Sequence, residues 1–370
     1  MPSNPSLRTH QQAATNHELS GSEALNDALT LCMERDPSTL IIGEGVPDPK
    51  GIFGTTDGLR QRFGSKRVFD MPLSENGLTG ICVGAAISGL RPIMVHQRID
   101  FALLAMDQLI NNAAKWRYMF ASQANVPLVV RCIVGRGWGQ GPQHAQSLQS
   151  LFSHIPGLKV VMPVFPDDAK GMLCAAVTDN DPVIFIEHRW IHSLRSEVAS
   201  EYYETPLDKA RVRREGCDIT IAAFSYMTVE ALHAADALTR LGLEAEVIDM
   251  RSVNPLDVPA VLNSVAKTGH LLVADTGHEN FGVAGELIAS VARQGFELLQ
   301  TAPASICLPN LPCPTSHAWA EHYYPTAINI ATQALHLCDI QIGRVQHHEL
   351  EKLRPTTLPD IPNPEYCGPF

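Results

Sequence analysis

The stretch RVFDMPLSENGLTGICVGAAISGLRPIMVHQR (67–98) decides the fold. Residues 67–77 read as a strand that runs into a turn, and RPIMVHQR (91–98) reads as a second strand. Between them the Gly- and Ala-rich segment 78–89 has the composition of a closely packed helix. A strand, a helix and a strand in this order predict two parallel strands joined by a crossover helix.

The same alternation continues on both sides of this stretch. We expect helices at 22–36, 101–122 and 167–179, and strands at 39–46, 126–135, 158–164 and 182–188. Runs of Val and Ile without polar alternation are typical of strands that are buried on both faces of a parallel sheet. These elements predict an α/β domain over 21–194, preceded by a polar N-terminal arm, 1–20.

A second domain of the same class follows. Residues 195–216 are charged and lack an apolar period, so we interpret them as an irregular linker. The alternation then resumes with expected strands at 218–224, 244–250 and 270–275 and helices at 227–242 and 283–295. We therefore expect two α/β domains with mainly parallel sheets, the second over 217–338. The Pro-rich tail 339–370 predicts an extended arm or disorder.

Composition excludes several classes of function. The 370 residues carry a net charge of -11, and no Lys/Arg cluster offsets it, which argues against a nucleic-acid partner. No apolar run approaches the roughly 20 residues that cross a bilayer, and the first residues lack the apolar core of a secretory signal. Nine cysteines without a CxxC pair favour reduced thiols over a zinc site or disulfides. We therefore expect a cytoplasmic protein.

Two polar segments follow predicted strands of the first domain. Glu75 begins a Gly-rich helix, and His144 ends the loop GRGWGQGPQH (135–144). Ligands of open α/β sheets bind at the carboxyl ends of the strands, and histidine suits acid–base chemistry near neutral pH. The alternatives are a solvated acid at a helix start and a structural histidine. The loop matches neither a phosphate loop nor GxGxxG.

The order of the motifs resembles one family. The segments are DMPLSENGLTGICVGAAISGLRPI, DQLINNAAKWRYM, the Gly-rich loop with QHAQS, HIPGLKVVMP, DNDPVIFIEHR, EAEVIDMRSVNPLD and NFGVAGELIA. In this order and spacing they resemble the beta chain of thiamine diphosphate-dependent 2-oxo acid dehydrogenases of the pyruvate type. The resemblance covers roughly residues 22 to 337. It implies a pyrimidine-binding domain and a transketolase C-terminal-like domain.

The resemblance also implies roles for single residues. Glu75 would hydrogen-bond the aminopyrimidine ring of the cofactor, and Phe101 would stack against that ring. Glu44 and Gln97 match further cofactor-binding positions. His144 matches the histidine that acts near the acyl-transfer step. For Phe101 the alternative is a core residue at the start of a helix.

A structural potassium site recurs in the family. The matching positions are Leu128, Ala176, Asp179 and Asp181, which would offer carbonyl and carboxylate oxygens to a hard cation. An ordinary helix end with Asp turn chemistry is the alternative reading of these positions.

The resemblance implies a partner chain. The sequence contains no Gly-Asp-Gly followed by Asn-Asn, the motif that binds diphosphate and Mg²⁺ in related chains. We therefore expect an alpha subunit to hold these groups in an α₂β₂ heterotetramer. We expect the substrate to be a small 2-oxo acid that is oxidatively decarboxylated, with acyl transfer to a lipoyl-bearing acyltransferase.

Some residues depart from the pyruvate-type pattern. Gln97 replaces a methionine, Asn76 replaces a small or apolar residue, and LPNLPCPTS (308–316) replaces a Val-Pro-Met-Pro form. The polar segment 95–98 favours a polar acceptor, unless His96 and Arg98 face a subunit interface. The first alternative function is therefore a free-standing carboligase or transketolase-like enzyme. The second is a non-catalytic structural paralogue, against which the retained Glu75, Phe101 and His144 argue.

Overall fold

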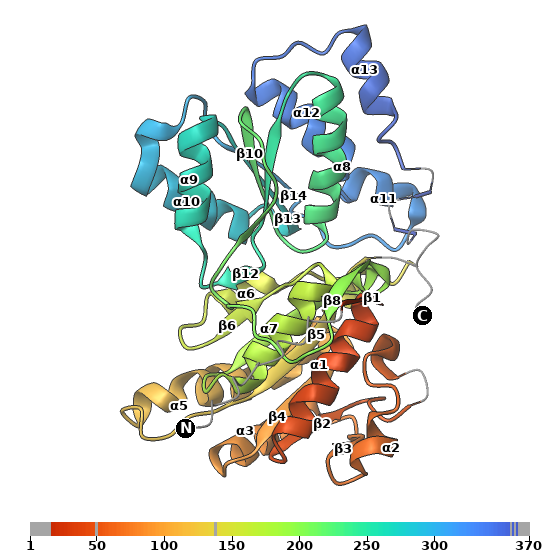
Figure 1. Cartoon of the computed structure of the whole chain (residues 1–370), viewed down its shortest axis with the longest axis vertical. Helices are drawn as coiled ribbons and strands as arrows, with labels where there is room; N and C mark the ends of the chain where they lie inside the picture. Colours follow the sequence, from red (N-terminus) through yellow and green to blue (C-terminus); the bar gives the residue numbers. More distant parts are fainter. Residues whose placement is uncertain (1–15, 49–50, 137–138, 356, 359, 362–370) are drawn as a thin grey trace, which may run out of the picture.

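Two sheets, one above the other in Figure 1, organise the computed structural model of the chain. The structure describes residues 16–48, 51–136, 139–355, 357–358 and 360–361. Each sheet is mostly parallel and carries helices on both faces, as expected from the sequence. Within the described ranges, no helix combines the length and the apolar character needed to cross a membrane.

The N-terminal domain is built on a seven-stranded sheet of order β12-β6-β7-β5-β4-β2-β3. Its six strands from this domain are parallel, whereas β12 comes from the second half of the chain and pairs antiparallel with β6. The bounds are β2 (Thr39–Gly43), β3 (Val68–Phe69), β4 (Arg91–His96), β5 (Val129–Val134), β6 (Lys159–Val161), β7 (Val183–His188) and β12 (Ser252–Asn254). The central strands are buried throughout, which explains their unbroken Val and Ile runs.

Helices cover both faces of this sheet. On one face α1 and α7 pack with residues such as Ile41 and Val129, and on the other α3 and the helical run after β4 pack with residues such as Met94. The bounds are α1 (Gly21–Arg35), α2 (Leu59–Phe63), α3 (Glu75–Ile87), α4 (Ile99–Ala102), α5 (Ala114–Met119), α6 (Gln149–Ser153) and α7 (Pro166–Thr178). Short 3₁₀ turns lie at η1 (Gly51–Gly54), η2 (Leu103–Ala105), η4 (Gly141–Gln143) and η5 (Arg189–Ser193).

The long helix expected over 101–122 is not one regular α-helix. The run from 99 to 119 passes from α4 through the 3₁₀ turn η2 and the π-helix η3 (Gln108–Ala113) into α5. The backbone stays right-handed at the junctions, so only the hydrogen-bond spacing changes. Apolar periodicity does not distinguish these spacings, because the side chains stay on nearly the same face.

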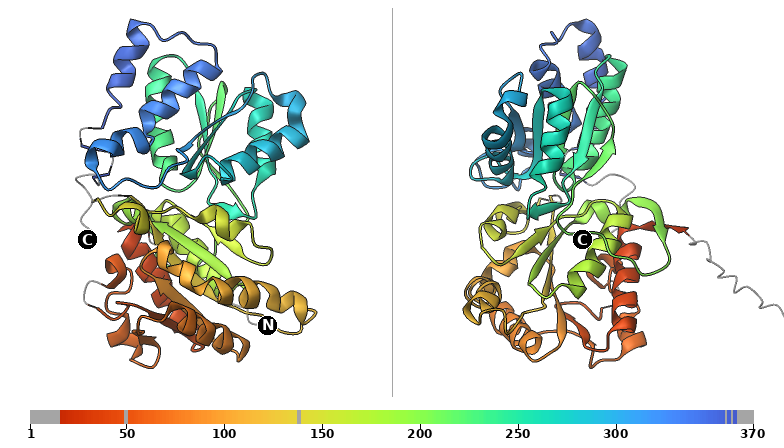
Figure 2. Two further views of the ribbon diagram at one scale, coloured as in Figure 1. Left: turned by 180° about the vertical axis from the view of Figure 1, so that it is seen from behind. Right: turned by 60° about the vertical axis from the view of Figure 1, so that its left-hand side comes forward.

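The C-terminal domain has a five-stranded sheet of order β14-β13-β10-β11-β9. Helices α9 and α10 cover one face, and α8 and α12 cover the other (Figure 2). The bounds are β9 (Arg211–Arg214), β10 (Ile219–Ala223), α8 (Met227–Arg240), β11 (Ala245–Asp249), α9 (Val258–Thr268), β13 (Leu271–His278), α10 (Val283–Gly295), η6 (Phe296–Leu298), β14 (Ala304–Leu308), α11 (His317–Tyr323), α12 (Ala327–Leu337) and α13 (Arg344–Glu351).

The segment 195–216 is more regular than the expected linker. It contains β8 (Arg195–Ala199), which pairs antiparallel with β1 (Asn16–Ser20), and the edge strand β9. Both are partly exposed and charged, so they lack the apolar period that reveals buried strands. The Pro-rich tail likewise includes helix α13, which buries Leu350 against the second domain. Residues 1–15 and 362–370 lie outside the described residues.

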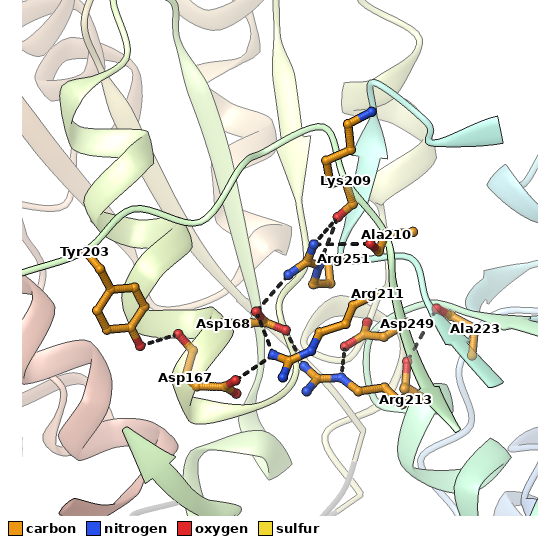
Figure 3. Close-up of polar contacts among 11 residues, drawn as sticks. Asp167, Asp168, Tyr203, Lys209, Ala210, Arg211, Arg213, Ala223, Asp249 and Arg251 are labelled. Atoms are coloured by element: carbon orange, nitrogen blue, oxygen red, sulfur yellow. Dashed lines mark hydrogen bonds and ion pairs between the residues drawn. The ribbon is translucent and has the colours of Figure 1, made fainter. Parts of the chain in front are cut away.

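A buried ion-pair network joins the two domains (Figure 3). Asp168 of α7 accepts a 2.8 Å hydrogen bond from Arg251 Nη1 and also contacts Arg213 of β9. Arg213 Nε lies 3.2 Å from Asp249 Oδ2, and Arg211 adds a contact to Asp168. Asp168 is 3% exposed and Asp249 is fully buried, so each carboxylate depends on these guanidinium partners.

The carboxyl ends of the two sheets face each other across the same junction. Gln149 Nε2 donates a 2.8 Å hydrogen bond to Asp275 on β13. Arg136, which follows β5, donates to the Pro325 carbonyl, and its guanidinium lies over the rings of Trp190 and Tyr324. The loops after β5 and β7 therefore lie between the domains.

Candidate active site

Three of the expected cofactor residues meet at the carboxyl ends of β2, β3 and β4. Glu75 is the first residue of α3 and is 9% exposed, because the turn after β3 delivers it to the edge of the sheet. Glu44 follows β2, and burial raises the pKa of its carboxyl, with further contributions from the charges of Glu75 and Asp70. Gln97 follows β4 and donates a 3.0 Å hydrogen bond to the Glu44 carbonyl. The first domain therefore has a cluster of partly desolvated acidic groups at this edge.

Phe101 and His144 form a second pair beside it. Phe101 lies on α4, four residues after Gln97, so the two groups share one short segment. The Phe101 and His144 rings meet edge to face, with their centroids 5.5 Å apart. Below them Gln146 Nε2 donates a 2.7 Å hydrogen bond to Asp100, and burial raises the pKa of Asp100. Phe101 and His144 are both partly exposed.

The Gly-rich loop before His144 needs its glycines. Gly135, Gly139 and Gly141 have φ of 127°, 65° and 69°, a region that side chains with a Cβ rarely adopt. A Cβ on Gly141 would lie 2.4 Å from Thr315 Oγ1 of the second domain, and one on Gly135 would lie 3.1 Å from the His188 ring. The described part of the loop is therefore packed closely between the two domains.

A buried ionic cluster anchors the loop that follows Glu44. Arg131 of β5 contacts Glu187 of β7 at 2.6 Å, and both side chains are fully buried. His192 Nε2 lies 3.0 Å from Glu187, and Arg131 Nη2 donates to Thr55 Oγ1 at 3.0 Å. The cluster holds residues near Thr55 against the sheet. The sequence analysis did not identify it, because no motif links residues so far apart.

The expected potassium positions gather at the opposite edge of the sheet. Asp179 caps the C-terminus of α7, and its Oδ2 lies 2.5 Å from Lys159 Nζ. Asp181 pairs with Arg117 at 2.7 Å, and the Leu128 carbonyl accepts from the Val183 amide. Arg91 Nη1 also donates to the Asp179 carbonyl. Cationic side chains thus occupy many of these oxygens, and Ala176 is buried in α7. Potassium binding stays a prediction that these contacts do not favour.

The structure also places His96, Asp70 and Asp100 near the expected site residues. His96 is 3% exposed, so its side chain does not lie on the surface where a subunit interface would form. Burial also lowers the pKa of His96 to about 4. Asp70, whose Oδ1 accepts from the Gly45 amide at 3.0 Å, and Asp100 were not singled out from the sequence as site residues. The available signals were the place of Asp70 at the end of the strand before Glu75 and that of Asp100 directly before Phe101. Among the described residues, no cluster of three or more His, Cys, Asp or Glu could hold a metal ion.

Comparison with known proteins identifies the family. Residues 17–191 match the transketolase pyrimidine-binding domain, and residues 208–330 match the transketolase C-terminal domain. The chain is 42% identical, over 331 residues, to the beta subunit of acetoin:2,6-dichlorophenolindophenol oxidoreductase from Bacillus subtilis (strain 168), covering 86% of this chain and 97% of that protein. The chain belongs to the beta subunits of thiamine diphosphate-dependent, E1-type dehydrogenases.

Further relatives of this E1-type beta subunit are named for pyruvate dehydrogenase rather than for acetoin. It is 38% identical to the pyruvate dehydrogenase E1 component subunit beta of B. subtilis (strain 168), over 80% of this chain and 91% of that protein. It is also 38% identical to the mitochondrial pyruvate dehydrogenase E1 subunit beta-2 of Oryza sativa subsp. japonica, over 88% of both chains. A solved structure titled split gene transketolase, inactive beta4 tetramer, superimposes with a TM-score of 0.73 at 20% identity, over 88% of this chain and 100% of that chain. That likeness shows the fold. The pyrimidine-binding domain implies that the E1-type beta subunit binds thiamine diphosphate.

Proposed function

We propose that the chain is the beta half of a dehydrogenase that oxidatively decarboxylates a small 2-oxo acid and passes the acyl group to a lipoyl-bearing acyltransferase. The observation that carries the proposal is the meeting of Glu75, Glu44 and Gln97 with Phe101 and His144 at one edge of the sheet. When bound, thiamine diphosphate supplies the electron sink that decarboxylation needs.

The residues present fit the pyrimidine end of that cofactor. Glu44 Oε1 is buried and has no hydrogen-bond partner within the described part of the chain, so a polar ligand atom would satisfy it. Glu75 would hydrogen-bond the ring nitrogen, and the Phe101 ring offers an apolar face to the pyrimidine. His144, whose ring contacts Phe101, would donate or accept a proton during acyl transfer. The diphosphate and Mg²⁺ would be held mainly by the alpha chain.

An exposed apolar surface on the first domain fits the alpha subunit that the names of the relatives imply. Helix α3 packs against η2 and η3, and together with α5 they present large exposed side chains. These are Ile81 (62% exposed), Leu104 (62%) and Tyr118 (89%), and Leu73 (83%) adds to them from the turn before α3. Contiguous apolar patches mark protein interfaces, and a Cβ on Gly84 would meet nothing within 4 Å, so a partner helix could approach closely. We place the alpha chain here in an α₂β₂ assembly, with beta–beta contact through the C-terminal domain.

Acetoin is the second candidate substrate. The relative with 42% identity acts on acetoin by its name, whereas the pyruvate dehydrogenase relatives are 38% identical. Both substrates carry a carbonyl carbon next to the bond that breaks, so the same Glu75 and His144 chemistry would serve either one. Gln97 donates to the Glu44 carbonyl but is itself exposed, so a polar acceptor could reach it and the carboligase is kept as a further candidate.

We further propose a cytoplasmic setting, which fits the absence of disulfides among the described cysteines. The eight cysteines in the described residues, Cys32, Cys82, Cys132, Cys174, Cys217, Cys307, Cys313 and Cys338, are all free thiols. Free thiols persist in reducing compartments.

The test is co-expression with a candidate alpha chain. The purified pair is assayed with pyruvate, longer 2-oxo acids and acetoin, first with dichlorophenolindophenol and then with a lipoyl domain as acceptor. Turnover of a 2-oxo acid with lipoyl acylation supports the proposal. Turnover of acetoin alone supports the second candidate, and activity restricted to aldehyde or sugar acceptors would support the carboligase.

A further inference from the structure

Arg189 occupies a place that the proposed function does not use. It is the first residue of η5, directly after β7, and is 1% exposed. Its Nη1 donates a 2.8 Å hydrogen bond to Gln140 Oε1, and its Nη2 lies 3.4 Å from the His144 carbonyl. One guanidinium therefore reaches two points of the loop that carries the candidate catalytic histidine.

The described part of the loop is held by contacts from outside it, including the close approach of Gly141 to Thr315, more than by hydrogen bonds of its own. Glycine adopts positive φ about as readily as negative φ. The positive φ of Gly139 and Gly141 therefore does not by itself fix the conformation of the loop. The internal hydrogen bond at its end, from the His144 amide to the Gly141 carbonyl, is 3.3 Å long. Contacts from outside the loop must therefore determine where His144 lies.

Arg189 is suited to that task because its side chain is buried against the start of the loop. Its Cγ would lie 3.1 Å from a Cβ on Gly135, so its stem fills the space beside the start of the loop. Its planar fork then presents donors at a fixed separation to Gln140 and His144, which a lysine ammonium does not do. The hydrogen bond to the carbonyl leaves the imidazole free to meet the Phe101 ring at 5.5 Å.

We propose that Arg189 is a positioning residue, which fixes the His144 loop through Gln140 and the His144 carbonyl and so sets the rate of the step that His144 serves. This inference rests on the proposed function for His144. It predicts that the loss of Arg189 impairs acyl transfer more than cofactor binding or CO₂ release.

The experiment uses the complex with the alpha chain. Arg189→Ala and Arg189→Lys are compared with Gln140→Ala, with the double variant Arg189→Ala/Gln140→Ala, and with the control Arg195→Ala, whose side chain is 49% exposed on β8. We expect Arg189→Ala to slow transfer to the acceptor about 10- to 100-fold, as the loss of a charge-assisted hydrogen bond does, with the KM for thiamine diphosphate unchanged within about twofold. Added guanidinium should restore part of the rate, Arg189→Lys should be intermediate, and the double variant should be no slower than Arg189→Ala.

A second readout does not need activity. Diethyl pyrocarbonate modification of His144, measured by peptide mass spectrometry in the complex without cofactor, should change in rate by about threefold or more in Arg189→Ala, while exposed His17 keeps its rate. Wild-type transfer in Arg189→Ala, an equal loss of CO₂ release and transfer, or an unchanged His144 modification rate would overturn the proposal. If the complex turned over none of the substrates, the proposed function would fail, yet the modification rate would still test the contact.

Discussion

The rings of Phe101 and His144 meet edge to face, with centroids 5.5 Å apart, although one belongs to α4 and the other to the loop after β5. Adjacent parallel strands β4 and β5 bring these segments together at their carboxyl ends. The ring that would pack on the cofactor and the imidazole that would serve acyl transfer are therefore one unit. A substitution of either residue should therefore change the position of the other ring.

Glu75→Gln should abolish activation of the cofactor. The amide keeps the shape of the side chain but loses its charge and its proton exchange, so exchange of the thiazolium C2 proton should slow by about 100-fold or more. Quenched-flow exchange followed by NMR measures this step. Glu201→Gln, at an exposed glutamate, serves as the control and should exchange at the wild-type rate. Wild-type exchange in Glu75→Gln would remove Glu75 from the mechanism.

His144→Ala should separate the two halves of the reaction. CO₂ release in a single turnover should persist, because Glu75 and the cofactor act in it without His144. Transfer to the natural acceptor should slow by about 100-fold or more, since a positioned proton donor is lost. Rapid-quench measurement of CO₂ and of acylated acceptor distinguishes the steps. Equal losses in both would place His144 earlier in the reaction, and no loss in either would make it a structural residue.

Ile81→Asp should prevent assembly with the alpha chain. The side chain is 62% exposed on α3, so the beta chain should fold normally, but a buried unpaired charge in the contact would weaken it strongly. Co-purification and native mass spectrometry measure assembly, and circular dichroism measures folding. Val345→Asp, which is 67% exposed on α13, is the matched control and should still assemble. An intact α₂β₂ complex with Ile81→Asp would show that the alpha chain binds elsewhere.

The pH dependence of stability should report on Asp249. Burial raises its pKa to about 6 from an ordinary 3.8, so the folded state binds the proton more tightly than the unfolded state. The stability from this group is therefore fully present below about pH 4 and is lost as the pH rises through 6, a change of roughly 3 kcal/mol at most. The difference in unfolding free energy between wild type and Asp249→Asn should fall over this window.

Urea unfolding at several pH values measures that difference. Ser252→Ala is the control. It removes a 2.7 Å hydrogen bond to the Pro255 carbonyl in the same interdomain segment but leaves every ionisable group in place. It should lower stability by about 1 kcal/mol at every pH. If the unfolding free energies of wild type and Asp249→Asn differed by the same amount at every pH, Arg213 would hold Asp249 ionised throughout. That result would contradict the expectation.

Local patterns predicted the regular part of this molecule. The Val- and Ile-rich strands and the amphipathic or small-residue helices of both domains lie close to their expected positions, as at α10 (Val283–Gly295) and β7 (Val183–His188). The π-helix η3 and the charged strands β8 and β9 were not predicted, because their hydrogen bonding depends on neighbours distant in the sequence. Strand β12 is the clearest case, since a segment of the second domain completes the sheet of the first.

The sequence by itself determined which residues stand at the ends of strands, and thereby Glu75 and His144, because strand length and glycine placement are local properties of the chain. Only the tertiary structure decided what surrounds them: Asp70 and Glu75 near Glu44, Gln146 on the Asp100 carboxylate, and Arg189 on the His144 loop. These contacts join residues that are separated by tens of positions. Their distances follow from sheet order and domain packing, which act through the hydrophobic core as a whole and leave no short-range pattern in the sequence.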